Sequence, residues 1–136
     1  MDKKRILVVD DEPGFTRLLK LTLEATGNYT VYAETDGMRG LEVAREFKPD
    51  LIFLDVVMPM IDGGDIASQI KSDPVLKDVP IVFLTALVSQ KEDSSLGLIA
   101  GFPFMAKPVT LDSLIQCIEE TPVSCSTSKV LVGESL

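Results

Sequence analysis

Short apolar segments alternate along the chain with longer segments in which apolar residues recur every three or four positions. The short segments are rich in β-branched and other apolar residues, which is typical of β-strands. They are Ile6–Val9, Tyr29–Ala33, Leu51–Leu54, Ile81–Leu84 and Phe104–Ala106. All but the second are nearly wholly apolar, as expected for strands that are covered on both faces of a parallel sheet. The more mixed second segment is predicted to be an edge strand.

The segments between these strands predict helices, because their apolar residues fall on one helical stripe. The stripes are Phe15, Leu18, Leu19, Thr22 and Leu23; Met38, Leu41, Ala44 and Arg45 with Phe47; Ile66, Ala67 and Ile70; and Leu111, Leu114, Ile115 and Ile118. Gln90–Ala100 predicts a weaker helix, since Ser94, Ser95 and Gly97 are poor helix formers. Strand and helix thus alternate five times, which predicts an α/β fold with a parallel sheet and helices on both faces.

Length and composition are typical of one globular domain. The chain has 136 residues, of which 46% are hydrophobic and 25% are charged. We place the domain at residues 1–120, because residues 121–136 contain several serines and no helical stripe. That last segment is predicted to be a tail or the stub of a linker to another domain.

The charge balance and the apolar runs exclude several classes of function. The 13 basic and 21 acidic residues give a net charge of −8, so we expect no direct binding to nucleic acid or to an anionic membrane. The apolar runs are too short to span a bilayer, and no signal peptide follows the basic start. Cys117 and Cys125 match no metal-binding pattern and are expected to be reduced thiols in the cytoplasm. Histidine is absent, which excludes catalytic groups built on it and most zinc sites.

Polar side chains follow the predicted strands at their carboxyl ends. Asp10 and Asp11 follow the first strand, Asp55 the third, Thr85 the fourth and Lys107 the fifth. In a doubly wound sheet of order 2-1-3-4-5, ligands bind beyond these ends, between strands 1 and 3. Each residue alone has a simpler explanation, such as helix capping by Asp10 or Asp11. Their common position at one edge of the sheet is better explained by a shared site.

Three neighbouring carboxylates repel one another unless a cation neutralises them. Oxygen ligands with open coordination positions suit Mg²⁺. A lysine and a hydroxyl opposite such a metal site would stabilise a transferred phosphoryl group, and a carboxylate can act as its acceptor. These residues therefore indicate chemistry on a phosphoryl group.

Four motifs surround these strand ends, namely Leu7–Asp11, Leu54–Gly63, Leu84–Ala86 and Lys107–Pro108. Through these motifs the sequence, from about Arg5 to Glu120, resembles the receiver domain of two-component response regulators. The resemblance implies a flavodoxin-like (βα)5 fold with a doubly wound, five-stranded parallel sheet. It also implies a signalling switch, not an enzyme, that catalyses only its own phosphorylation and dephosphorylation. The phosphoryl group would come from a sensor histidine kinase or a histidine phosphotransfer protein.

The resemblance also assigns residues to the phosphorylation site. Asp55 would be the phosphoacceptor. Mg²⁺ would be bound directly by Asp11 and Asp55, largely through water by Asp10, and by the backbone carbonyl of Val57. The output of the switch, its pathway and its partner kinase cannot be predicted from the sequence.

Further residues are assigned to catalysis and switching. Lys107 would pair with the phosphoryl group, Thr85 would close onto it, and Phe104 would move inward with Thr85. This movement would change the surface of helix 4, strand 5 and helix 5, through which a homodimer could also form. The Lys107–Pro108 peptide bond is expected to be cis.

Two departures from the family pattern carry expectations of their own. Phe102 and Pro103 stand where small and acidic residues are common, and Phe104 lacks a tyrosine hydroxyl, so its signal would be steric. Val57 and Leu87 are apolar at positions where the family tunes access of the hydrolytic water. We hypothesise that they slow dephosphorylation.

Three alternative functions remain as competing hypotheses. A phosphatase with an aspartyl nucleophile usually has a second aspartate two residues on, where this chain has Val57. A flavin or dinucleotide carrier would need a glycine-rich turn after the first strand, and the turn here is acidic instead. A receiver that serves only as a docking module is the third.

Overall fold

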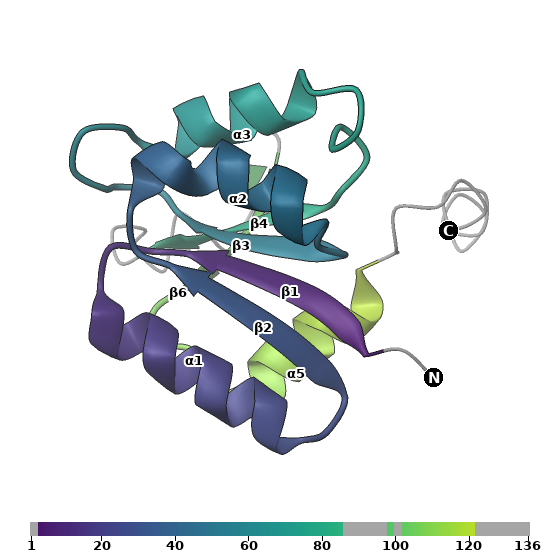
Figure 1. Ribbon diagram of the computed structural model, residues 1–136. Coiled ribbons are helices and arrows are strands. Elements are labelled where there is room, and N and C mark those ends of the chain that lie inside the picture. The colour runs from purple at the N-terminus through teal and green to yellow at the C-terminus, as the bar shows by residue number, and fades with distance from the viewer. Residues whose placement is uncertain (1–2, 86–97, 100–101, 122–136) are drawn as a thin grey trace.

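A central β-sheet with helices on both faces forms the fold (Figure 1). The computed structural model describes residues 3–85, 98–99 and 102–121. In chain order the elements are β1 (Lys4–Val9), α1 (Pro13–Ala25), β2 (Tyr29–Glu34), the 3-10 helix η1 (Gly37–Arg39), α2 (Gly40–Phe47), β3 (Leu51–Asp55), α3 (Gly63–Lys71), β4 (Ile81–Thr85), β5 (Leu98–Ile99), β6 (Phe102–Ala106) and α5 (Leu111–Glu120).

The strands lie in the order β2-β1-β3-β4-β6-β5. β2, β1, β3, β4 and β6 pair in parallel. With β6 as the fifth parallel strand, the predicted order 2-1-3-4-5 is confirmed, and β2 lies at the predicted edge. The register places Val9 beside Leu54, and Asp55 beside Leu84, so the ends of β1, β3 and β4 meet at one edge of the sheet.

The prediction of a helix over Gln90–Ala100 is wrong at its end. Leu98 and Ile99 form the short strand β5, which pairs antiparallel with Pro103 and Phe102 of β6. The β-branched Ile99 and the adjacent sheet edge favour pairing over a helical turn there. The other residues of the predicted helix lie outside the described residues, as do Leu87, Cys125 and the segment 122–136.

Each face of the sheet carries its own hydrophobic cluster, because successive side chains of a strand point to opposite faces. Leu7 and Val9 pack with residues of α2 and α3, whereas Ile6 and Val8 pack with residues of α1 and α5. Figure 1 shows these two helix pairs on either side of the sheet. Both faces of the central strands are therefore covered.

Local hydrogen bonds fix where several helices begin. The Asp62 side chain accepts a hydrogen bond from the backbone N–H of Asp65 at 2.9 Å and caps α3. Thr110 and Ser113 form a reciprocal capping box at the start of α5. The predicted stripe that begins at Met38 starts too early, since Met38 lies exposed in η1 and α2 begins at Gly40.

The edge strand β2 is fastened to α1 by two charged side chains. Glu24 accepts a hydrogen bond from the backbone N–H of Val31 at 2.9 Å. Lys20 donates to the Val31 carbonyl at 2.7 Å and to the Glu24 carboxylate at 3.0 Å. The strand is also tied to α5, because the Tyr29 hydroxyl donates to the Glu119 carboxylate at 2.6 Å.

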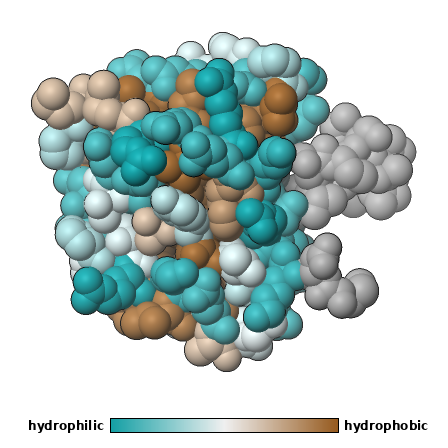
Figure 2. Space-filling view, viewed as in Figure 1, coloured by the Kyte–Doolittle hydropathy of each residue, from teal (hydrophilic) through white to brown (hydrophobic). Residues whose placement is uncertain are grey.

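The surface seen in Figure 2 is mostly hydrophilic, with hydrophobic residues in small patches. Among the described residues, no helix combines the length and apolar character that a membrane crossing requires.

Candidate functional site

Three carboxylates meet where β1 and β3 end. Asp10 follows β1 and is fully buried, Asp55 ends β3 and is 6% exposed, and Asp11 is half-buried. One carboxylate oxygen from each lies within 4.8 Å of the others. The structure thus brings together the aspartates that the sequence assigned to one site.

The loop from β3 to α3 holds Asp55 in place through a close backbone contact. The backbone N–H of Gly63 donates to the Val56 carbonyl at 2.7 Å. A Cβ atom at Gly63 would overlap the Asp55 carbonyl oxygen, so only glycine permits this approach. Met60, in the same loop, has a positive φ of 75°. The start of α3 is therefore locked onto the end of β3.

Lys107 reaches the carboxylates from the end of β6. Its backbone N–H donates to the Thr85 carbonyl at 2.8 Å, and the Lys107–Pro108 peptide bond is cis. The Lys107 ammonium lies 2.7 Å from Asp10 Oδ2, 2.9 Å from Glu12 Oε1 and 4.0 Å from Asp55 Oδ2. The site is thus an acidic cluster with one cation at its side.

The same ammonium also lies against an aromatic ring. Lys107 Nζ is 4.5 Å from the centre of the Phe15 ring, which belongs to the first turn of α1. This distance permits a cation–π interaction. Phe15 is therefore a further neighbour of the ammonium, beside the carboxylates.

Burial and mutual repulsion disfavour charge on Asp55. Burial and the negative charge of Asp10 raise the pKa of Asp55 to about 7, and the nearby Lys107 ammonium only partly offsets them. For Lys107, burial acts to lower the pKa, but the contacts with Asp10 and Glu12 outweigh it and raise the pKa. The cluster is therefore short of positive charge.

The residues of this cluster fit a divalent cation. Asp10 Oδ1 accepts a hydrogen bond from the Glu12 backbone N–H at 3.0 Å, and the buried Oδ2 has the Lys107 ammonium 2.7 Å away as its charged neighbour. Three hard carboxylate oxygens within 4.8 Å of one another suit Mg²⁺. Val57, predicted to contribute its carbonyl, lies beside them, and its N–H points to Asp55 Oδ1 at 3.4 Å.

The two predicted switch residues lie on neighbouring strands. Thr85 ends β4 and is buried. Phe104 lies in β6, half-buried, opposite Phe83 and against the cluster formed with α2 and α3. Phe102, in the same strand, packs edge-on against Phe83 with ring centres 5.5 Å apart. Thr85 thus lies at the end of the strand next to Asp55, and Phe104 lies one strand further out, while their roles remain predictions.

Sequence reasoning missed two partners of Lys107, namely Glu12 and Phe15. Glu12 directly follows the acidic pair, and that adjacency was the available signal. Phe15 was assigned to the buried stripe of α1, and its contact with Lys107 depends on how β6 ends beside that helix.

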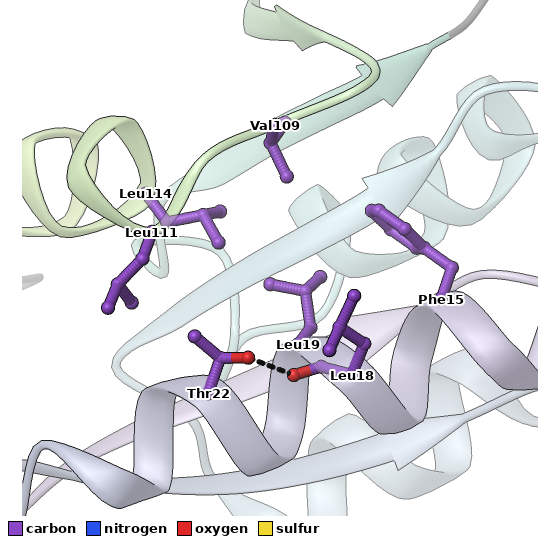
Figure 3. A pocket seen from close by; sticks show the side chains of 7 residues that line it. All are labelled: Phe15, Leu18, Leu19, Thr22, Val109, Leu111 and Leu114. Atoms are coloured by element: carbon purple, nitrogen blue, oxygen red, sulfur yellow. Dashed lines mark hydrogen bonds between the residues drawn. The ribbon is translucent and has the colours of Figure 1, made fainter.

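An apolar pocket of about 130 Å³ lies between α1 and α5. Figure 3 shows the side chains that line it: Phe15, Leu18, Leu19, Thr22, Val109, Leu111 and Leu114. The Thr22 hydroxyl already donates to the Leu18 carbonyl at 2.6 Å. Because its walls carry no titratable group, this pocket is not the chemical site.

Comparison with known proteins identifies the family of the chain. A family model described as the response regulator receiver domain matches residues 6–119. The chain is 34% identical over 82% of its length to the DNA-binding dual master transcriptional regulator RpaA of Synechocystis, and covers 46% of that protein. It is 42% identical over 77% of its length to the alkaline phosphatase synthesis transcriptional regulatory protein PhoP of Bacillus subtilis, and covers 42% of it. The chain thus spans less than half the length of these two relatives.

A solved structure with the same fold contains the expected metal. It is the receiver domain of sensor histidine kinase PA1611 from Pseudomonas aeruginosa, with a magnesium ion coordinated in its active-site cleft. The TM-score is 0.75 at 28% identity, and the alignment covers 87% of this chain and 96% of the other.

Proposed function

Because the chain belongs to the response regulator receiver domain family, in which the domain is a phosphoacceptor and not a turnover enzyme, we propose that it is a phosphorylation-dependent signalling switch. Asp55 would accept the phosphoryl group. The observation that carries this proposal is the meeting of Asp10, Asp11 and Asp55 within 4.8 Å, with Lys107 at their side.

The transfer is a simple displacement at phosphorus. A carboxylate oxygen of Asp55 forms a new O–P bond as the N–P bond of a phosphohistidine breaks, and the electron pair returns to the imidazole nitrogen. Asp10, Asp11, Asp55 and the Val57 carbonyl would hold Mg²⁺, which when bound supplies positive charge against the phosphoryl oxygens. Lys107 and Thr85 would add an ammonium charge and a hydroxyl donor. The residues thus position the acceptor and offset charge.

The phosphoryl group would come from a histidine outside these 136 residues, because they contain none. A sensor histidine kinase or a histidine phosphotransfer protein in the cytoplasm fits this requirement. Inward movement of Thr85 and Phe104 would then change the surface formed by β6, α5 and the segment before them. This surface is the proposed contact for an output partner or a second copy of the chain.

The domain is proposed to end at residue 120, with 121–136 as a tail or linker stub. Within the part of the chain that the structure describes, Leu114 and Ile118 of α5 complete the buried cluster on one face of the sheet. We therefore expect a chain that ends at Thr121 to accept phosphate as the full chain does, measured by intact mass. A chain that ends at Leu111, which lacks most of α5, is expected to unfold.

Intact-mass analysis after incubation with acetyl phosphate tests the function directly. The expected result is one acid-stable, base-labile phosphoryl group that requires Mg²⁺ and is absent in Asp55→Asn. A protein that binds Mg²⁺ but stays unmodified by acetyl phosphate and by a panel of phosphorylated histidine phosphotransfer proteins would favour the docking-module hypothesis.

A further inference from the structure

We propose that Glu12 is a positioning residue that holds the Lys107 ammonium before phosphorylation and so weakens the site's affinity for a phosphoryl group. This inference rests on the proposed function, and it adds a residue that regulates the same site. It draws on the contacts of Lys107, on the exposure of Glu12 and on the position of Glu12 at the start of α1.

The Lys107 ammonium is closer to Glu12 than to the acceptor. Its distance is 2.9 Å to Glu12 Oε1 and 4.0 Å to Asp55 Oδ2. The Lys107 side chain is only 14% exposed, with Asp10 and the Phe15 ring as its other neighbours. The ammonium therefore has few positions available, and in this one it contacts Asp10 at 2.7 Å and Glu12 in place of Asp55.

Glu12 is the partner that can release Lys107. Asp10 is fully buried and is held by the Glu12 backbone N–H, so its carboxylate cannot move far. The Glu12 side chain is 62% exposed, and water can replace Lys107 as its partner. Exposed ion pairs are weak for this reason.

The side chain of Glu12 does not stabilise the start of α1. Glu12 is the N-cap residue of α1, but its side chain makes no capping hydrogen bond. The long glutamate side chain bends to Lys107 instead, across 95 positions of sequence. The Glu12 carboxylate thus contacts the Lys107 ammonium and not the backbone of α1.

A phosphoryl group on Asp55 would compete with Glu12 for this ammonium. The Glu12 carboxylate also repels the incoming anion, because both are negative. Removal of the charge without a change of shape should therefore strengthen anion binding. For an exposed carboxylate we expect a gain of about two- to five-fold in affinity.

The test uses the full chain with Mg²⁺ and beryllofluoride, a stable mimic of an aspartyl phosphate, and measures the dissociation constant by calorimetry. Glu12→Gln should bind beryllofluoride two- to five-fold more tightly than the unmodified chain at low salt, and the difference should shrink in about 1 M salt. Glu12→Asp keeps the charge on a shorter side chain and should fall between the two. Glu42→Gln is the matched control, since Glu42 is 61% exposed and pairs with Arg39 instead.

A second readout needs neither metal nor anion. In the metal-free protein, Glu12→Gln should speed hydrogen exchange of the Lys107 ammonium, followed by nitrogen-15 NMR and assigned with Lys107→Arg. A change in anion affinity no larger than that of Glu42→Gln would overturn the inference. A loss of Mg²⁺ affinity of ten-fold or more in Glu12→Gln would also overturn it, since Glu12 would then act on the metal.

The outcomes separate this inference from the proposed function. If the unmodified chain binds beryllofluoride and Asp55→Asn does not, the proposed function stands and the Glu12 comparison decides the inference. If the unmodified chain does not bind beryllofluoride with Mg²⁺ present, both are overturned.

Discussion

Asp55 lies where a negative charge is unfavourable, next to Asp10 and largely out of water. Its raised pKa of about 7 means that the folded protein holds a proton on this site at a pH where the unfolded chain does not. Between about pH 4 and pH 7, ionisation of Asp55 therefore costs folding stability, and above pH 7 the full cost is present. A bound cation would remove this cost.

Replacement of Asp55 by Asn should therefore stabilise the metal-free protein at high pH. At pH 8 we expect the free energy of unfolding to rise by about 2 kcal/mol, roughly half of the full electrostatic value because solvent and neighbours relax. The gain should be small near pH 4, where Asp55 is protonated in the folded protein and about half protonated in the unfolded chain, and Mg²⁺ should reduce it at pH 8. Urea unfolding at pH 4 and pH 8 measures this, and a gain independent of pH would contradict the electrostatic origin.

The hypothesis that Val57 and Leu87 slow dephosphorylation can be tested at these two positions. Val57 is exposed two residues beyond Asp55, and its backbone N–H lies 3.4 Å from Asp55 Oδ1. Polar replacements at both positions should admit and orient water, so that Val57→Asn with Leu87→Asn shortens the phosphoryl lifetime several-fold. Intact-mass measurements over time monitor the loss of the phosphoryl group. Val75→Asn, another exposed valine, is the control, and an equal lifetime in the two variants would refute the hypothesis.

At the scale of elements, the central strands could be predicted because burial on both faces leaves a nearly continuous apolar run. β1, β3 and β4 contain the predicted ranges and extend them by one or two residues. The start of β6 was missed, since Phe102 and Pro103 precede the predicted strand and proline disfavours that assignment. β5 was missed because two residues cannot show a period. Whether such a short segment forms a strand depends on its pairing with a neighbouring strand of the sheet.

Gly63 joins two elements, and its replacement should damage both. In Gly63→Ala the new methyl group would overlap the Asp55 carbonyl, so β3 or α3 must shift. We expect the variant to lose about 2–3 kcal/mol of stability and most of its phosphorylation rate. Gly64→Ala adds the same methyl group one residue later, where its nearest neighbour is the Asp62 side chain at 3.3 Å. Urea unfolding and intact mass should show a much smaller effect there.

Those residues of the candidate site that come directly after a strand could be predicted from the sequence. Asp10, Asp55 and Lys107 are adjacent to apolar runs, and sheet topology brings strand ends together. The contacts of Lys107 with Glu12 and Phe15 could not be read in this way. They depend on where the long side chains at the end of β6 and the start of α1 point. The periodic pattern of apolar residues carries no information about these directions.

At the scale of the whole molecule, a few contacts link parts of the chain that are far apart in sequence. The bond from Tyr29 to Glu119 joins the edge strand β2 to α5 across 90 positions. It spans the face of the sheet on which α1 also packs. The last helix is therefore held by a polar contact as well as by its apolar face.

Removal of the Tyr29 hydroxyl should loosen this link. Tyr29→Phe keeps the ring in the core but leaves Glu119 without its donor, so we expect a loss of about 1 kcal/mol of stability. Tyr32→Phe, at an exposed tyrosine of the same strand, should change stability by less than about 0.5 kcal/mol. Thermal unfolding compares the two, and equal midpoints would show that the hydroxyl contributes nothing.

The contacts of Lys20 and Glu24 with β2 also affect whether copies of the protein can associate through this edge of the sheet. The outward N–H and C=O of Val31 are already engaged by these two side chains. A strand from another molecule would have to displace both charged groups before it could join this border of the sheet. Crowding should therefore not drive copies of the protein to add to one another there. Assembly through this part of β2 is therefore disfavoured.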